Sequence, residues 1–160
     1  MIQTFDGVAT VSRGDVILIL YAGESRVHRT RWLFDRIDEF AATQPADVTM
    51  MGVLIVPQTA GIPDAATREE NRVRLNRLGR RIRRVVTVSL GNDLATALAR
   101  TVMKALMVLT QNATVHSVTS STETALRLVE RERSARTPSQ TLLRGYVTGL
   151  YDALKLPQPA

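Results

Sequence analysis

Three runs of apolar, β-forming residues constrain the fold of this 160-residue chain most strongly. The runs are VILILY at 16–21, MMGVLIV at 50–56 and RVVTVSL at 84–90, and segments with helical periodicity separate them. Uninterrupted runs of this kind are typical of strands that are buried on both faces, as in parallel sheets. The helices between such strands form right-handed crossovers that cover the sheet.

Two weaker strands complete the pattern. Residues 8–11 precede the first run across a turn at Arg13, Gly14 and Asp15, which predicts an antiparallel hairpin, and ATVHSVTS at 113–120 predicts the last strand. We therefore predict an α/β fold: a mostly parallel sheet of about five strands with an antiparallel edge hairpin, helices packed on it and an extra C-terminal helix.

Polar residues at helix starts suggest where the helices begin. The predicted caps and capping boxes are Ser25, Thr67 with Glu70, Ser120 with Glu123, and Thr137 with Gln140. The arginine-rich helix after Thr67 is expected to end near Arg83. A further helix over 92–111 is apolar on nearly every side.

We divide the chain into an α/β domain, residues 1–136, and a C-terminal helix, residues 137–156. The terminal helix has a wide apolar face made of Leu142, Leu143, Tyr146, Val147, Leu150 and Leu154. A helix with such a face has to cover it. The expected cover is the helix over 92–111, in the same chain or in a second subunit, and a lipid-like ligand between the two helices is the alternative.

The order of these elements resembles the STAS-like domains of anti-sigma-factor antagonists over roughly residues 5–133. The resemblance rests on the apolar helix DLATALARTVMKALMVLTQ and on the strand TVHSV that leads into STETALRLVE. It implies regulation by protein binding. The segment LIVPQTAGIPDAATREEN contains no serine where these antagonists carry their phosphorylated turn, so the resemblance does not extend to phosphorylation.

Most catalytic equipment is missing from the sequence. There is no cysteine, no glycine-rich phosphate loop follows a strand, and neither His28 nor His116 has a second histidine at helical spacing. We predict no catalytic residue, no metal site and no cofactor, and therefore a protein that is not an enzyme. Without a long apolar segment or a signal-like N-terminus, the expected location is cytoplasmic.

The formal charge of +6 is concentrated in one segment, because seven arginines and no acid lie between Arg72 and Arg84. Leu75, Leu78 and Ile82 form the expected buried stripe. The candidate surface for an anionic partner consists of Arg72, Arg74, Arg77, Arg80, Arg81 and Arg84. A merely solvated helix face is the alternative interpretation. Since no aromatic residue occurs between 41 and 145, a nucleic acid would find no stacking platform here. The expected partner is a protein, and an anionic membrane surface or a nucleic acid is the less favoured alternative.

The leading hypothesis is a non-catalytic regulatory or adaptor protein that acts by protein–protein binding, with a homodimer as one form of it. The alternative is a small-ligand or lipid-binding protein. In open parallel sheets, ligands bind beyond the carboxyl ends of the strands. Those ends correspond to the loops 22–25, 57–64 and 90–93, with Gly61, Gly91, Asn92 and Asp93 as the ligand-loop candidates.

Overall fold

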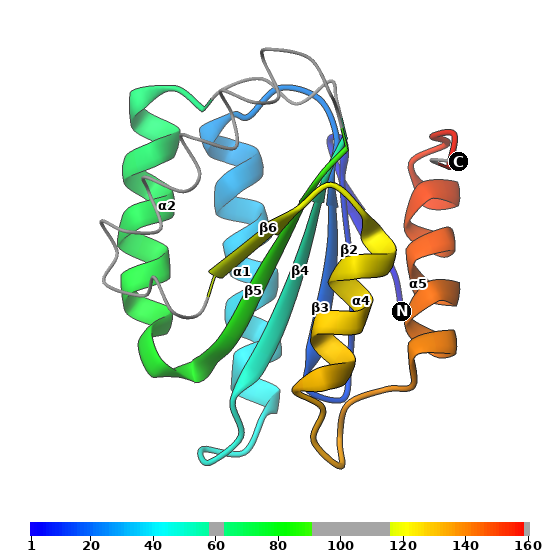
Figure 1. Cartoon of the computed structure of the whole chain (residues 1–160). Helices are drawn as coiled ribbons and strands as arrows, with labels where there is room; N and C mark the ends of the chain where they lie inside the picture. Colours follow the sequence, from blue (N-terminus) through cyan, green and yellow to red (C-terminus); the bar gives the residue numbers. More distant parts are fainter. Residues whose placement is uncertain (58–62, 91–115, 159–160) are drawn as a thin grey trace.

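The computed structural model describes residues 1–57, 63–90 and 116–158, and within them it shows one six-stranded sheet with helices on both faces (Figure 1). The strands are β1 (Gln3–Phe5), β2 (Val8–Arg13), β3 (Val16–Tyr21), β4 (Met50–Val56), β5 (Ile82–Ser89) and β6 (His116–Thr119). The helices are α1 (Val27–Thr43), α2 (Ala65–Leu78), the 3-10 turn η1 (Gly79–Arg81), α4 (Thr122–Arg131) and α5 (Gln140–Ala153).

Strands that follow one another in the chain also lie side by side in the sheet. The pairs β1–β2 and β2–β3 are antiparallel, whereas β3–β4, β4–β5 and β5–β6 are parallel. This arrangement confirms the predicted fold class. The strand that the sequence did not reveal is β1, whose three residues are all exposed. So short and polar a strand leaves no apolar pattern to detect.

Strand β3 explains why its apolar run is uninterrupted. Leu18 and Leu20 belong to the core under α4 and α5, whereas Ile17, Ile19 and Tyr21 belong to the core under α1 and α2. Successive side chains of a strand point to opposite faces. Because helices cover both faces (Figure 1), every residue of β3 is buried.

The terminal helix α5 packs against β2, β3 and α4 of the same chain. Leu143, Leu150 and Tyr151 are buried in the core on this side, whereas Leu142 is exposed. The helix predicted over 92–111 lies outside the described residues, so its predicted contact with α5 does too. Among the helices that are described, none has both the length and the hydrophobicity needed to cross a membrane.

The end of the arginine-rich helix was predicted wrongly. Helix α2 stops at Leu78 because Gly79 follows with a φ of 48°, a conformation that favours glycine. Arg81 therefore lies in η1, and Arg84 lies in β5 together with Ile82. The arginines of this segment do not share one helical face.

The predicted helix starts also need correction. The N-cap residues are Arg26, Asp64, Ser121 and Ser139, in place of the expected Ser25, Thr67, Ser120 and Thr137. Three of the four observed caps accept a backbone N–H bond, and that of α1 does not. At the starts of α4 and α5 several hydroxyl residues stand close together, so spacing alone did not select the right one.

Candidate functional site

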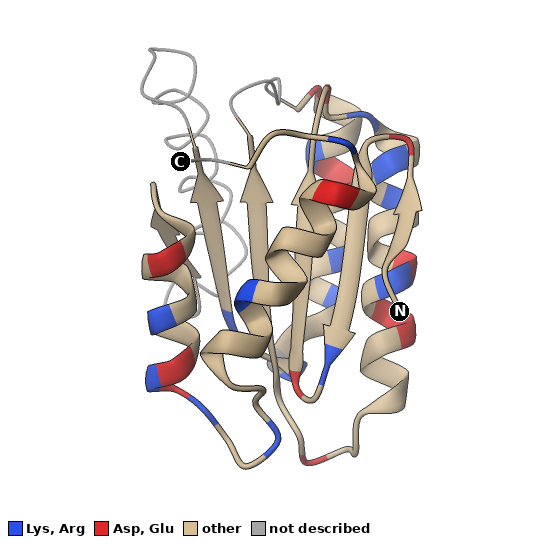
Figure 2. Cartoon of the chain, turned by 90° about the vertical axis from the view of Figure 1, so that its right-hand side faces the viewer, with Lys and Arg blue, Asp and Glu red and all other residues tan. Residues whose placement is uncertain are grey.

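A pocket lies where the parallel strands β5 and β6 end, between the first turn of α4 and the face of α5 that runs from Arg144 to Tyr151. Its volume is about 430 Å³, which is in the range of small-molecule sites. After α5 the chain runs back across this edge toward the start of α4 (Figure 2). We call it the carboxyl-edge pocket, and its lining residues are Leu90, Ser120, Ser121, Thr122, Glu123, Leu126, Arg144, Val147, Thr148, Tyr151 and Gln158.

Helical spacing brings the side chains of α5 to the pocket. Arg144, Val147, Thr148 and Tyr151 stand at positions i, i+3, i+4 and i+7, which lie on one face of a helix. The opposite wall is the first turn of α4. A helix start carries backbone N–H groups without partners in the helix and a partial positive charge.

Two residues that line the pocket carry a hydroxyl group without a hydrogen-bond partner among the described residues: Thr122 on α4 (Oγ1) and Tyr151 on α5 (Oη). Tyr151 is only 2% exposed, so solvent does not freely replace the missing partner. The hydroxyl of Ser121, in contrast, accepts the Thr124 N–H at 3.3 Å as the cap of α4. Buried hydroxyl groups without a partner are uncommon in proteins, and a ligand is one reason for them.

The charged groups of the pocket are paired with one another. Arg144 donates two hydrogen bonds to Glu123, at 2.6 and 3.0 Å, Gln140 donates a third at 2.9 Å, and Arg127 lies 3.5 Å away. The hydrogen bonds from Arg144 lower the pKa of Glu123, and burial raises the pKa of Tyr151. At neutral pH, Glu123 is therefore ionised and Tyr151 is protonated.

A second cavity, of about 190 Å³, lies between the sheet and helices α1 and α2. Its lining is almost entirely apolar and includes Ile19, Leu33, Leu54 and Leu75. Undescribed segments adjoin both cavities: 58–62 and 91–115 precede Pro63 and His116 here, and 91–115 and 159–160 follow Leu90 and Gln158 in the carboxyl-edge pocket. We build no site on the apolar cavity because its lining offers few polar groups to orient a ligand.

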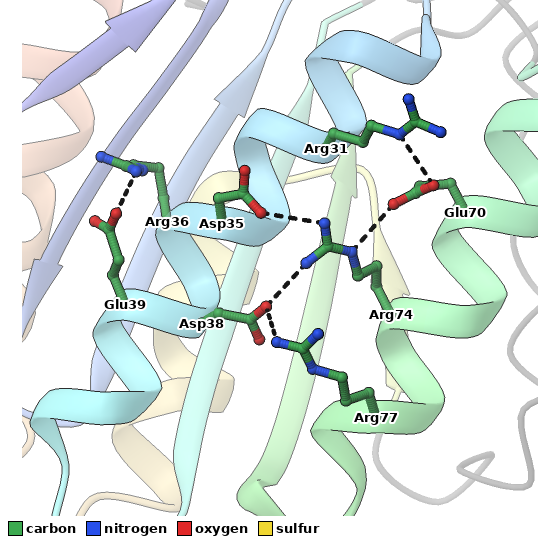
Figure 3. Close-up of polar contacts among 8 residues, drawn as sticks. All are labelled: Arg31, Asp35, Arg36, Asp38, Glu39, Glu70, Arg74 and Arg77. Atoms are coloured by element: carbon green, nitrogen blue, oxygen red, sulfur yellow. Dashed lines mark hydrogen bonds and ion pairs between the residues drawn. The ribbon is translucent and has the colours of Figure 1, made fainter.

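The arginines that the sequence proposed as an anionic-partner surface are mostly bonded to the protein itself. Arg74 reaches Asp35, Asp38 and Glu70 at 3.0–3.1 Å, and Arg77 reaches Asp38 at 2.8 Å. The eight residues drawn in Figure 3 comprise four arginines and four carboxylates, so this surface between α1 and α2 is balanced in charge.

The remaining arginines of the segment have other roles. Arg72 binds Glu69, and Arg84 binds Glu132 and the Ser117 hydroxyl. The guanidinium of Arg81 donates to the carbonyl oxygens of Ala41 and Gln44 at the end of α1. The side chain of Arg80 is not described. This pairing leaves less uncompensated positive charge than the sequence suggested, and the anionic-partner surface stays a prediction.

The opposite edge of the sheet holds a second polar group, the Asp15 cluster. The carboxylate of Asp15 is fully buried, and its Oδ2 accepts bonds from Arg83 at 2.8 Å, Ser134 at 2.8 Å and Thr137 at 3.1 Å. Burial alone would raise the pKa of Asp15, but these hydrogen bonds outweigh it and lower the pKa. The cluster fastens the α4–α5 connection to the turn between β2 and β3.

The predicted ligand-loop residues Gly61, Gly91, Asn92 and Asp93 all lie outside the described residues. Leu90, which begins one of the predicted loops, does line the carboxyl-edge pocket. Sequence reasoning missed the residues after β6 because it assigned them to capping alone. The row Ser120, Ser121 and Thr122 directly after a parallel strand was the available signal.

No protein-family model matches the sequence, and no curated protein matches it either. The described residues also contain no group of three or more side chains suited to bind a metal ion. We therefore infer the function from the geometry of the carboxyl-edge pocket.

Proposed function

We propose that this chain is a non-catalytic binding protein and that the carboxyl-edge pocket takes a small ligand with hydrogen-bond acceptors. The observation that carries the proposal is that Tyr151, whose buried hydroxyl lacks a partner among the described residues, belongs to the lining of this pocket. A buried donor without a partner costs roughly 1–3 kcal/mol. A ligand that accepts its hydrogen bond removes that cost and so gains affinity.

The titration behaviour of the pocket supports a binding role over catalysis. General acid–base catalysts need a pKa near the working pH. The pKa of Glu123 is lowered and that of Tyr151 is raised, so both move away from neutrality. The residues of the pocket hold a ligand without exchanging protons with it.

Native mass spectrometry of the gently purified full chain, followed by the same measurement under denaturing conditions, tests the proposal. We expect a small molecule that leaves on denaturation, and Tyr151→Phe should reduce its occupancy. The control is Tyr146→Phe on the same helix, which does not line the pocket and should keep full occupancy. A panel of small polar compounds is then screened, and a compound that binds should raise the melting temperature of the protein. If no compound binds and none is retained, the proposal is wrong.

A regulatory or adaptor role through protein binding is the second candidate, and an exposed aromatic pair favours it. Phe5, 41% exposed, stacks on Trp32 with ring centroids 5.6 Å apart. Aromatic residues are enriched in protein interfaces.

Light scattering at increasing concentration would test the homodimer, and Phe5→Asp should keep the chain monomeric if this pair is the contact. The STAS-like resemblance agrees with such a role and stays a proposal.

A further inference from the structure

We propose that the end of the molecule where the parallel strands begin binds the surface of an anionic lipid membrane, through three unpaired arginines and an exposed leucine. This surface is separate from the carboxyl-edge pocket, which lies where the strands β5 and β6 end.

The three arginines differ from the other arginines whose side chains the structure describes. Those others bond to a carboxylate, a hydroxyl or a backbone carbonyl of the protein, as Arg74 and Arg81 do. Arg13, Arg131 and Arg136 are exposed, and within the described part of the chain their side chains make no hydrogen bond or ion pair. We call these three residues the free arginines.

The free arginines come from separate segments that meet at one end of the molecule. Arg13 ends β2, Arg131 ends α4, and Arg136 lies in the α4–α5 connection. This connection touches the turn after β2, since a Cβ added at Gly14 would lie 1.9 Å from the Arg136 carbonyl oxygen. Arg13 points to the same face of the sheet as Val11, the face that α4 and α5 cover. Figure 2 shows basic residues on the connection and beside the neighbouring turn.

The carboxylates at this end leave the free arginines uncompensated. Three of them are paired with other arginines: Asp15 with Arg83, Glu130 with Arg133, and Glu132 with Arg84. Asp47, in the loop before β4, is exposed and has no partner among the described residues. Subtracting its charge from those of the three free arginines leaves an excess of two positive charges at this end.

An exposed apolar side chain accompanies these charges. Leu142 is 43% exposed and lies in the first turn of α5, which directly follows the α4–α5 connection (Figure 1). Basic side chains next to exposed leucine are typical of surfaces that lie on a membrane, where the leucine enters the acyl boundary and the cations contact the headgroups. Each arginine near an anionic membrane surface raises the affinity by about fivefold.

The freedom of the arginine side chains favours a membrane over an acidic protein. Recognition of individual carboxylates requires each guanidinium to be fixed in one orientation, and ordering a long side chain costs free energy. No described neighbour holds the free arginines in place. A lipid surface attracts them through its diffuse negative potential, which requires no fixed geometry.

Co-sedimentation of the full chain with lipid vesicles at low salt tests the proposal. Vesicles of phosphatidylglycerol and phosphatidylcholine in equal parts should bind the protein, vesicles of phosphatidylcholine alone should bind it much less, and added salt should release it. The combined variant Arg13→Gln, Arg131→Gln and Arg136→Gln should weaken this binding about a hundredfold. Leu142→Gln should weaken it about three- to tenfold. Because the changed side chains have no described partners, urea denaturation of the variants should match that of wild type.

The matched control removes the same total charge from other exposed arginines, in the combined variant Arg26→Gln, Arg31→Gln and Arg72→Gln. Their side chains are 58%, 60% and 48% exposed, and each is paired with a glutamate. Vesicle binding should fall less than about fivefold in this control, because most of these charges lie more than a Debye length from the bound surface. An equal fall in both triple variants would refute the proposal, since net charge alone would then explain the binding.

Two further results would overturn the proposal. If the protein does not prefer anionic vesicles to neutral ones, this end is not a membrane-binding surface. If polyglutamate binds, needs the free arginines and leaves anionic vesicles unbound, the surface takes an acidic protein and the assignment to lipid is wrong.

Discussion

The two edges of the sheet use similar side chains in opposite ways. The amino edge, where the parallel strands begin, holds the Asp15 cluster. Its members hydrogen-bond to one another: the Asp15 carboxylate, Arg83, and the hydroxyls of Ser134 and Thr137. At the carboxyl edge, Thr122 and Tyr151 line a pocket, and their buried hydroxyls lack partners among the described residues. Bonds among the amino-edge groups fasten the α4–α5 connection, although Oδ1 of Asp15 and Nε of Arg83 also lack a partner among the described residues, whereas the two carboxyl-edge hydroxyls bond to no described group.

The largest effect is expected at the centre of the amino edge. Replacing Asp15→Ala leaves Arg83 without its carboxylate and two hydroxyls without an acceptor. Breaking a buried ion pair by removing one partner costs about 3–5 kcal/mol. Urea denaturation at neutral pH should show this loss in the free energy of unfolding, whereas Asp47→Ala, at an exposed turn, should change it little. A loss below about 1 kcal/mol would mean that the Asp15 cluster does not hold the connection in place.

Acid should reduce the contribution of the Asp15 cluster to the free energy of unfolding, and the variant Asp15→Asn separates this effect from other effects of acid. The fold lowers the pKa of Asp15, so its stabilising contribution is complete above the unfolded pKa of about 3.9 and is lost as the pH falls through the folded pKa. Wild type should therefore exceed Asp15→Asn in unfolding free energy at pH 7, and the difference should shrink by pH 3. A difference that stays constant with pH would show that the carboxylate charge is not the stabilising feature.

Arg81 forms a similar set of internal hydrogen bonds, at the end of helix α1. It bonds two carbonyl oxygens at the end of that helix, that of Gln44 and that of Ala41, which also accepts the Gln44 N–H at 3.2 Å. Because these hydrogen bonds come from a charged donor, Arg81→Gln should cost about 1–2 kcal/mol. Arg77→Gln, whose side chain is 65% exposed, is the matched change and should cost at most about 1 kcal/mol. Equal costs would favour the alternative interpretation, in which these arginines are merely solvated.

The spacing of apolar residues predicted the fold well, because apolar residues mark the side chains that are buried in strands and helices. The runs of β3, β4 and β5 had to be strands, since helices cover both of their faces. The prediction for the arginine segment failed for a local reason. Gly79 ends α2, and the pattern of arginines and leucines does not reveal the change from helix to strand that follows.

The sites were harder to predict because they join residues far apart in the sequence. Asp15 and Thr137 are 122 positions apart, and the sequence assigned the first to a turn and the second to a helix cap. In the carboxyl-edge pocket, the hydroxyl row after β6 was visible, but its meeting with Tyr151 depends on how α5 packs. Sequence reasoning could predict the correct edge of the sheet and not the wall formed by α5.

The most direct test of the comparison makes the same substitution at both edges, and the smallest effect of all is expected for its carboxyl-edge member, Thr122→Val. Thr137→Val removes a hydroxyl that donates to Asp15 at 3.1 Å and accepts the Ser134 N–H at 2.8 Å, so it should cost about 1.5–3 kcal/mol. Thr122→Val removes a hydroxyl without a partner among the described residues, so it should change the unfolding free energy by roughly zero or raise it slightly. Both changes keep the β-branched shape, and chemical denaturation of the two variants beside wild type compares them directly. A cost for Thr122→Val as large as that for Thr137→Val would mean that the carboxyl edge is structural too, and the two edges would no longer differ in kind.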